Sequence, residues 1–430
     1  MVSEFVRRSG VPQLYFTGSL QPTSADDLGL FHDEVARTST LPGRDLILAA
    51  KPASWDAALR LVAAALPETG PAIVVLDELP WLLDRDRGLD GTLQTVWDRV
   101  LEGRQVLLIL IGSDLSVMQA LTTHGRPLFG RPHEMVVRPF TVRDTARLLR
   151  LGKRAADAFD AHLVTGGYPR LLVEASRHET TRGFLVDQLR DENSLLCVIA
   201  GRVLDAEFPS EAQAHAVLRA VGSGERTFGN IAHAAAISQM TLQRALELLM
   251  LKGVVARDQP ACVPPANQPR YRIEDSYLRF WLAIVQPSIA LIERGRADLA
   301  VERLDAAWRS WRGRAIEPIV RDALQRLAST DPRLGGAAHV SGWWPRNNNP
   351  EVDLVGVDRA SDPRRVCFVG AIKWREDAPF DIVDLNKLQA DASRVPGVDH
   401  TTPRVAVART RVTAPGITAL SANDLLHAWP

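Results

Sequence analysis

The stretch AIVVLDE (72–78) decides the fold class of this chain. Its run of isoleucine, valine and leucine residues predicts a strand that is buried on both faces, as the strands of parallel sheets are. A helical segment, TLQTVWDRVLE (92–102), and a second apolar strand, QVLLILIGS (105–113), follow it along the chain. Because strand, helix and strand in this order form a βαβ unit, the first third of the chain is predicted to be α/β.

The rest of the chain divides into segments of different character. Before the strand at 72–78 we expect one more strand and three helices (strand 12–19; helices 1–9, 28–38 and 54–66). Helical periodicity dominates from about 141 to 205. Three helices then precede two strand-like pieces, a pattern typical of a winged helix (strands 254–257 and 270–273; wing tip 265–268). Farther on, helices and strands alternate again (helices 313–328 and 382–394; strands 351–358, 364–374 and 404–409).

Four domains follow from this division. We predict an α/β core, a helical lid, a winged helix and a second α/β domain (1–140, 141–208, 209–285 and 286–430). A chain of 430 residues has room for two to four domains at roughly 100–200 residues each.

The composition is that of a globular protein without a strong global charge. The chain is 46% apolar and 24% charged with a net charge of +0, so contact with nucleic acid or membrane requires a local patch. Its 3 cysteines form no CxxC pair, which argues against a zinc ribbon or a disulfide framework and fits a reducing cytosol. No stretch approaches the roughly 20 apolar residues of a membrane span, and the N-terminus shows no signal-peptide pattern. We therefore predict a cytoplasmic protein with no membrane partner.

Two acidic residues end the deciding strand. In open α/β sheets, ligands bind in the crevice outside the carboxyl ends of the strands. There Asp77 would hold Mg²⁺, directly or through water, and Glu78 would polarise the water that attacks a phosphoryl group. The alternative is an acidic turn after a core strand, followed here by Pro80. The next strand ends in Gly112 and Ser113, so a polar residue stands at the neighbouring strand end.

Four segments in this order, VVLDELPWLL, LILIGSDLSVM, PLFGRP and GGYPRLL, resemble the prokaryotic AAA/STAND-type ATPases first catalogued in archaea. The resemblance covers nearly the whole chain, because that family joins such a P-loop core to a winged helix and a restriction-nuclease-like C-terminal domain. It implies ATP and Mg²⁺ as cofactors, Ser113 as a sensor residue, and Arg131 as an arginine that reaches a γ-phosphate. The alternative for Arg131 is a solvated loop arginine.

The segment GGYPR (166–170) also takes a role from this resemblance. Pro169 would lie against the adenine of the nucleotide, near Gly166 and Gly167. The alternative is a plain turn between two helices.

The phosphate-binding loop of this family is missing. The pattern GxxxxGK[ST] occurs nowhere, and none of the five lysines follows a glycine-rich loop. Such a loop cradles phosphates with backbone N–H groups and adds one lysine charge. MVSEFVRRSG (1–10) resembles the helix that follows the loop, so we expect the chain to begin one step after it, through a late start codon or a true loss. Weak or absent ATP hydrolysis is therefore predicted for the chain as printed.

The predicted winged helix has a candidate recognition helix that begins near Gln239 and includes Thr241, Gln243 and Arg244. The second helix of a helix-turn-helix enters the major groove of DNA, and phosphate contacts need basic residues around it. Few are close in sequence (Arg244, Lys252, Arg257, Arg270 and Arg272). Two hypotheses stay open: DNA contact through this helix, and a packing module between two domains.

The C-terminal α/β unit resembles PD-(D/E)xK nucleases, whose acids hold Mg²⁺ and whose lysine positions the attacking water. The resemblance makes Asp353 and Glu317 the candidate metal ligands and Lys373 the lysine, but Ala371 stands where the motif has glutamate. Because hard cations depend on carboxylate count, we predict an inactive nuclease site. The alternatives are an active site compensated by Glu376, and a fold that never cleaved nucleic acid. In the purely structural interpretation, Lys373 pairs with Asp353.

These observations predict a nucleotide-responsive, DNA-associated protein of the AAA type with a degenerate nuclease-like domain. ATP binding would bias the arrangement of its C-terminal domains. One competing hypothesis is an ATP-dependent endonuclease, against which Ala371 speaks. Another is a non-catalytic regulatory or interaction protein. The resemblance also implies the hypothesis of a homo-oligomer, because in AAA-type rings an arginine such as Arg131 reaches the nucleotide of a neighbouring subunit.

Overall fold

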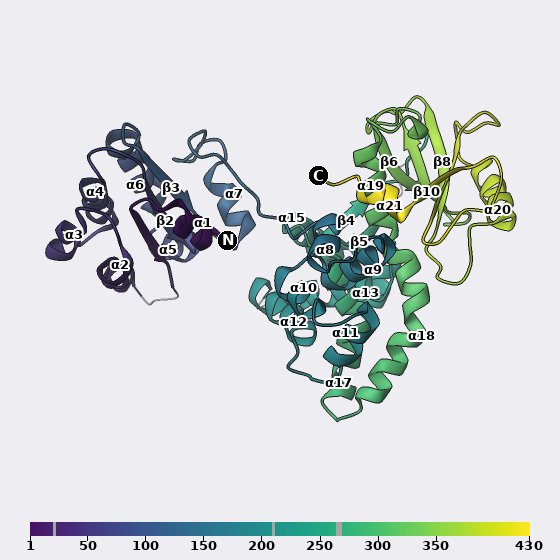
Figure 1. Cartoon of the computed structure of the whole chain (residues 1–430), viewed down its shortest axis with the longest axis horizontal. Coiled ribbons are helices and arrows are strands. Elements are labelled where there is room, and N and C mark those ends of the chain that lie inside the picture. The colour runs from purple at the N-terminus through teal and green to yellow at the C-terminus, as the bar shows by residue number, and fades with distance from the viewer. Residues whose placement is uncertain (20–22, 209–210, 264–268) are drawn as a thin grey trace. The chain divides into compact units, whose positions relative to one another are not determined.

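The computed structural model describes residues 1–19, 23–208, 211–263 and 269–430 (Figure 1). The chain forms two compact units, 1–136 and 137–430. The predicted wing tip at 265–268 lies outside the described residues. In the described part of the chain, no helix is both long and apolar enough to cross a membrane.

A three-stranded parallel sheet forms the centre of the first unit. Its order is β1-β2-β3 (Gln13–Thr17, Ala72–Asp77 and Val106–Leu110). The prediction of a parallel α/β core is thus confirmed, and β2 is buried from Ala72 to Leu76 as expected for a central strand. Strand β3 is different, because among the described residues it pairs with β2 alone. None of its five apolar residues is fully buried, and Leu107 is 48% exposed.

The two faces of this sheet are covered unequally. Alternate residues of a strand point to opposite faces, so Ile73 and Val75 of β2 meet Val6 of α1 (Val2–Ser9), while Val74 and Leu76 face the larger core. Several helices build that larger core (α2 Ser24–Thr38, α3 Arg44–Ala50, α4 Trp55–Ala65, α5 Leu79–Arg85 and α6 Leu89–Val96). A π-helical turn, Trp97–Leu101, continues α6, and α7 (Leu115–Leu121) follows β3.

Helices dominate the first part of the second unit. The segment predicted as a lid contains five of them (α8 Val142–Leu148, α9 Ala155–Thr165, α10 Pro169–Ala175, α11 Thr181–Gln188 and α12 Leu195–Glu207). Three more helices and an antiparallel strand pair then follow in the order predicted for a winged helix (α13 Ala212–Gly222, α14 Phe228–Ala234, α15 Gln239–Leu251, β4 Val255–Asp258 and β5 Arg270–Ile273). Ser238 caps α15 by accepting the N–H of Thr241.

A set of short helical turns leads into the long helix α18 and then α19 (α16 Ser276–Phe280, π-helix Trp281–Val285, 3₁₀ turn Gln286–Ser288, α17 Ile289–Ile292, α18 Ala297–Ala315 and α19 Glu317–Leu327). One continuous hydrophobic core runs from helices α8–α12 through α13–α15, β4 and β5 to this region and the sheet beyond it. The segments predicted as three separate domains therefore pack as one compact unit.

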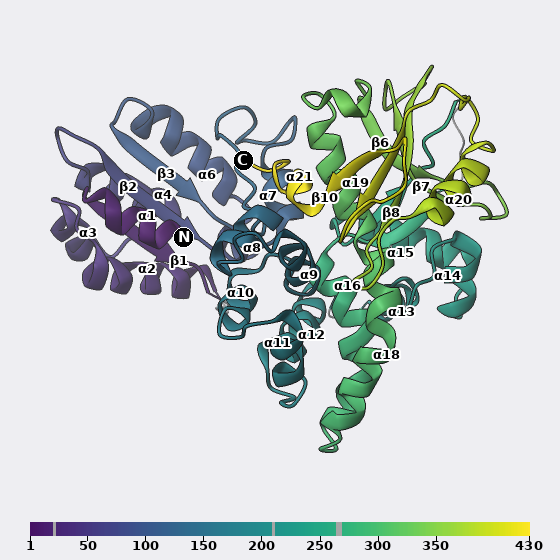
Figure 2. The same ribbon diagram turned by 45° about the vertical axis from the view of Figure 1, so that its right-hand side comes forward.

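The second unit also contains a mixed five-stranded sheet of order β10-β9-β8-β7-β6 (β6 His339–Trp343, β7 Val352–Val357, β8 Val366–Lys373, β9 Arg404–Ala408 and β10 Thr418–Ser421). The pairs β8–β9 and β9–β10 are parallel, and the pairs β6–β7 and β7–β8 are antiparallel. Helix α20 (Ile382–Ala392) covers one face, while α19 and α21 (Ala422–Leu426) lie on the other (Figures 1 and 2). A 3₁₀ turn, Pro332–Leu334, precedes β6. The prediction of a second α/β unit is confirmed at this level.

Candidate functional site

The structure brings Asp77, Glu78 and Ser113 together at the carboxyl ends of β2 and β3. Asp77 ends β2, and Glu78 follows it at the start of α5. The Ser113 hydroxyl donates a 3.0 Å hydrogen bond to Glu78 Oε2. The two strands run in parallel register, with Leu76 opposite Leu110, so their polar residues emerge at the same edge of the sheet.

Tyr15 on β1 is a member of this cluster that the sequence interpretation missed. Its hydroxyl donates a 2.7 Å hydrogen bond to Asp77 Oδ2, and the Glu78 N–H donates to Asp77 Oδ1 at 3.0 Å. Burial raises the pKa of Tyr15, and the bond to the Asp77 carboxylate raises it further. A tyrosine within a short buried strand two residues before its end was the available signal, since a buried tyrosine hydroxyl usually has a partner.

The backbone at this site is strained. Glu78 has φ 54°, in the left-handed region that few residues other than glycine adopt. Such a conformation costs on the order of 1–3 kcal/mol and is concentrated at functional sites. The Leu79 N–H donates to the Ile111 carbonyl at 2.8 Å, which fixes the turn against the end of β3. Gly112 lets the end of β3 lie close to Pro80 and Met118, because a Cβ there would lie 2.6 Å from Met118 Sδ and 2.7 Å from Pro80 Cδ.

Arg131 lies in an ion pair within the first unit. Its guanidinium donates two hydrogen bonds to the Asp98 carboxylate, at 2.7 and 2.8 Å, and a third to the Pro127 carbonyl at 2.9 Å. Arg131 is exposed, which agrees with the alternative of a solvated loop arginine, and its recorded contacts do not include the acidic pair. To reach a γ-phosphate, Arg131 would have to leave Asp98.

The acidic pair offers ligands that suit Mg²⁺. Asp77 and Glu78 provide two carboxylates, and Ser113 provides a hydroxyl. Magnesium prefers such oxygen ligands and is usually held by one or two carboxylates together with substrate phosphates. Among the residues that the structure describes, no group of three or more His, Cys, Asp or Glu side chains is arranged as a metal site. The site thus fits a magnesium ion only as part of a complex with phosphate groups.

GGYPR (166–170) forms the tight turn between α9 and α10. Gly166 caps α9 in the left-handed region with φ 60°, and Pro169 is the first residue of α10. The Phe140 N–H donates to the Gly167 carbonyl at 3.0 Å, and a Cβ on Gly167 would lie 2.0 Å from the Phe140 oxygen. Both glycines are therefore required by the packing of the turn itself. The nucleotide-binding role of Gly166, Gly167 and Pro169 stays a prediction.

The residues of helix α15 that were predicted to contact DNA differ in their exposure to solvent. Gln239, Gln243 and Arg244 are exposed and Thr241 is half-buried. The Gln243 amide donates to Glu247 at 2.6 Å. The nearby cations are largely paired with acids (Lys252 with Glu207; Arg272 with Asp258 and Glu274). Little positive charge is left to contact a phosphate backbone.

Glu317, Asp353 and Lys373 come together in the second unit, at the start of α19, the start of β7 and the end of β8. The Asp353 carboxylate accepts the Ile372 N–H at 2.8 Å. Glu317 accepts a 3.1 Å hydrogen bond from Arg321, whose Nε donates to the Asp353 carbonyl at 2.9 Å. Arg321 was not predicted from the sequence, although its spacing of four residues from Glu317 is the usual helical signal for an ion pair.

Two arginines from the segment predicted as a winged helix reach the edge of this acidic cluster. Arg270 of β5 is 7% exposed, donates to Glu351 at 2.6 Å and to the Asn348 side chain at 2.9 Å, and stacks over the Trp344 ring at 4.2 Å. Arg226 donates to the same Glu351 oxygen at 3.3 Å. Burial raises the pKa of Glu351, but the two arginines outweigh it, so that its pKa is lowered. These contacts favour the packing-module hypothesis for the winged helix.

Magnesium does not fit the cluster of Glu317, Asp353 and Lys373 as these side chains stand. Ala371 supplies no ligand, Glu317 is bound to Arg321, and Glu351 is neutralised by arginines of the winged helix. Glu376, the candidate compensating acid, is bound instead to Arg312 of α18. Among the described residues, Asp353 is then the one acid of this cluster outside an ion pair, and a single such carboxylate is too few for a hard cation.

Glu317 makes this cluster sensitive to pH. Burial raises its pKa to about 7 from an ordinary 4.5, Arg321 opposes the rise, and Asp353 adds to it. The folded state therefore binds the proton of the Glu317 carboxyl more tightly than the unfolded state does. The resulting contribution to folding stability is complete below pH 4.5 and is lost as pH rises toward 7. Glu317→Gln, which stays neutral, should therefore gain stability relative to the natural chain on the order of 2–3 kcal/mol between these limits.

Urea unfolding of the intact chain at several pH values measures this effect. Glu302→Gln, at an exposed position of α18, is the control and should show no such pH dependence. If the free energies of unfolding of Glu317→Gln and the natural chain differ by the same amount at every pH, the pKa of Glu317 is not raised in the folded state.

Comparison with known proteins matches part of this chain to a described family. The family DUF234, archaeal and bacterial proteins of unknown function, matches residues 281–390, which include Glu317, Asp353 and Lys373. An uncharacterized protein of Methanocaldococcus jannaschii is 21% identical over 332 residues, 76% of this chain and 73% of that protein.

Two solved structures show weaker similarity. A Walker-type ATPase of Pyrococcus abyssi aligns with a TM-score of 0.48 and 18% identity, over 64% of this chain and 84% of that one. The Aeropyrum pernix ORC1 protein, solved in complex with DNA, aligns with a TM-score of 0.29 and 14% identity, over 70% and 82% of the two chains.

Proposed function

We propose that this chain is a nucleotide-responsive, DNA-associated protein of the AAA type whose nuclease-like domain does not cleave nucleic acid. One observation carries the nucleotide part of the proposal. The strained Glu78 follows Asp77 at the carboxyl end of the central parallel strand and is held by Ser113 of the neighbouring strand end. This arrangement gives one acid to hold Mg²⁺ and one to polarise water, as phosphoryl transfer requires.

The proposal of an inert nuclease-like domain rests on Ala371 and Arg321. The first removes a carboxylate from the motif, and the second occupies Glu317. Metal-dependent cleavage of plasmid DNA that is abolished by Asp353→Ala would instead establish the ATP-dependent endonuclease.

ATP binding and turnover by the intact chain test the nucleotide part. Without a GxxxxGK[ST] loop, the backbone cradle and the lysine charge are absent from the sequence, so we expect no hydrolysis above background and weak, Mg²⁺-dependent binding of an ATP analogue. Asp77→Asn should remove the dependence on Mg²⁺, whereas Asp98→Asn, which alters only the partner of Arg131, should keep it. Submicromolar affinity with full turnover would contradict the expected impairment, and binding that ignores both Mg²⁺ and Asp77 would refute the site.

A second candidate is a non-catalytic interaction protein, favoured by the arginines that fasten the winged helix to Glu351. Retention on DNA at low salt separates the two, because phosphate contacts are strongest there. Retention that falls on Arg244→Ala supports the DNA-associated protein, and no retention at low salt supports the interaction protein.

A further inference from the structure

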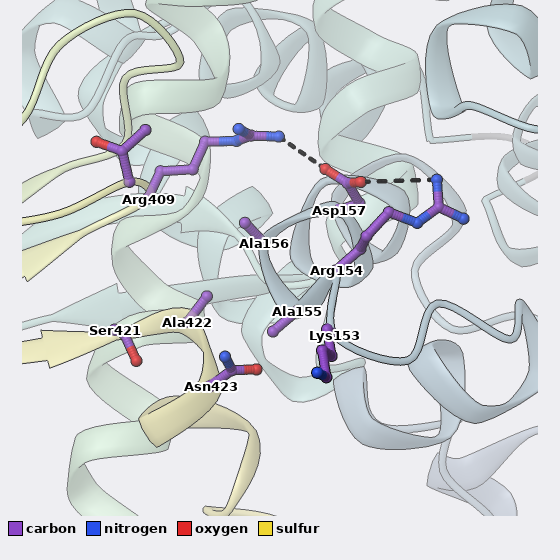
Figure 3. Close-up of a pocket in the computed structure, with 10 residues that line it drawn as sticks. Lys153, Arg154, Ala155, Ala156, Asp157, Arg409, Ser421, Ala422 and Asn423 are labelled. Atoms are coloured by element: carbon purple, nitrogen blue, oxygen red, sulfur yellow. Dashed lines mark hydrogen bonds and ion pairs between the residues drawn. The ribbon is translucent and has the colours of Figure 1, made fainter.

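A cavity of about 220 Å³ opens in the second unit where the parallel strands β9 and β10 end (Figure 3). Arg409 and Thr410 follow β9, and Ser421 and Asn423 stand at the end of β10 and the start of α21. Lys153 and the first residues of α9 form the opposite wall. Ligands of open α/β sheets bind outside the carboxyl ends of parallel strands, and no role has been assigned to this edge so far.

The wall of the cavity carries three cations and a single carboxylate. Arg409 donates to Asp157 at 2.9 Å, and Arg154 approaches the same carboxylate from the other side at 4.0 Å (Figure 3). Arg409 also binds the buried Asp160, so its guanidinium is fixed in place. Lys153 is exposed and has no acidic partner among the described residues. The cavity therefore keeps an excess of positive charge.

The size of the cavity and its hydrogen-bond donors limit the class of ligand that it can bind. Pockets for drug-sized molecules measure about 300–1,000 Å³, so this cavity encloses a single small group. The Lys153 ammonium and the Asn423 side-chain amide can donate to such a group, while the Ser421 hydroxyl is already bonded to Asp424. A compact anion with several acceptor oxygens meets both the charge and the donors.

We propose that this cavity binds the phosphate group of a small phosphate-bearing molecule. Lys153 is its principal charge, Arg154 turns from Asp157 toward it, and Asn423 donates from the facing wall. The Arg154–Asp157 pair is exposed and long, so releasing it costs little. Arg409 stays with its two aspartates, which neutralise its charge, so Lys153 and the released Arg154 supply the positive charge of the cavity.

Titration of the intact chain with inorganic phosphate at constant ionic strength tests the proposal. Lys153→Ala combined with Arg154→Ala removes two charge-assisted hydrogen bonds, so it should weaken phosphate binding about tenfold or more. The matched control is Arg202→Ala combined with Arg394→Ala, which removes the same charge from exposed positions elsewhere in the unit. This control should bind phosphate within about twofold of the natural chain. Hydrogen exchange of all three proteins checks that each is folded.

Three results would overturn the proposal. The first is the absence of saturable phosphate binding by the natural chain. The second is an equal loss in both double variants, which would mark a non-specific charge effect. The third comes from an oligonucleotide without terminal phosphates: if its binding depends on Lys153 and Arg154 while phosphate binding does not, the cavity contacts nucleic acid instead.

Discussion

Replacing Asp160 by alanine should destabilise the second unit by about 3–5 kcal/mol, the usual effect of removing one partner from a buried ion pair. Asp160 is 4% exposed and accepts hydrogen bonds from Arg312 at 2.9 Å and from Arg409 at 2.9 and 3.1 Å. Its other oxygen accepts the Trp374 indole N–H at 2.8 Å. The variant would leave Trp374 without an acceptor and Arg312, 2% exposed, with Glu376 alone.

These contacts join the lid helix α9 to α18 and to the ends of β8 and β9, so the loss should be visible in all of these elements. Hydrogen exchange of the intact chain measures it locally, because amides exchange through opening reactions of different free energy. Asp322→Ala is the control, since it breaks an exposed helical pair with Arg326 that contributes about 0–1 kcal/mol. Equal protection in the two variants would show that Asp160 does not hold these elements together.

Gly167→Ala should cost about 2–5 kcal/mol of folding stability. The left-handed backbone of Gly167, φ 75°, costs an alanine about 1–2 kcal/mol. The new Cβ would also lie 2.0 Å from the Phe140 oxygen, and relief of such overpacking typically costs a further 1–3 kcal/mol. Urea unfolding of the intact chain measures the total.

Gly152→Ala isolates the steric part of this effect. Gly152 has φ 52°, and no atom lies within 4 Å of the place that a Cβ would occupy, so only the conformational cost applies there. A difference of about 1–3 kcal/mol between the two variants is expected. If Gly167→Ala is no worse than Gly152→Ala in stability but lowers the affinity for an ATP analogue, the glycine serves the nucleotide rather than the turn.

The elements with strong local patterns were predictable. The run at 72–78 forms a buried central strand because its apolar residues need cover on both faces. The helix predicted at 54–66 forms as α4, and Ser54 caps it by accepting the Ala57 N–H. Strands β6 and β10 were missed. Their sequences, HVSGW and TALS, lack a clear apolar alternation, and pairing with β7 and β9 stabilises them. Such strands depend on tertiary neighbours more than on their own residues.

The acidic residues of the candidate sites could be predicted from the sequence, but the arginines that contact them could not. Glu78 and Ser113 meet because neighbouring parallel strands end at one edge, which sequence order alone indicates. Arg226 and Arg270 reach Glu351 across 125 and 81 residues of chain. No local spacing encodes such a contact, because it depends on how the winged helix docks against the β6–β7 end of the sheet.

The open side of β3 has a consequence for how the first unit behaves at high concentration. An edge of five apolar residues without lysine or proline lacks the usual protection against pairing with another chain. A contact from β3 to β3 would be antiparallel and would close as a pair. A contact from β3 to the outer side of β1 would keep the parallel direction, leave a fresh β3 at the end and permit growth without limit. The side on which a neighbour docks would decide between a discrete dimer and a precipitate.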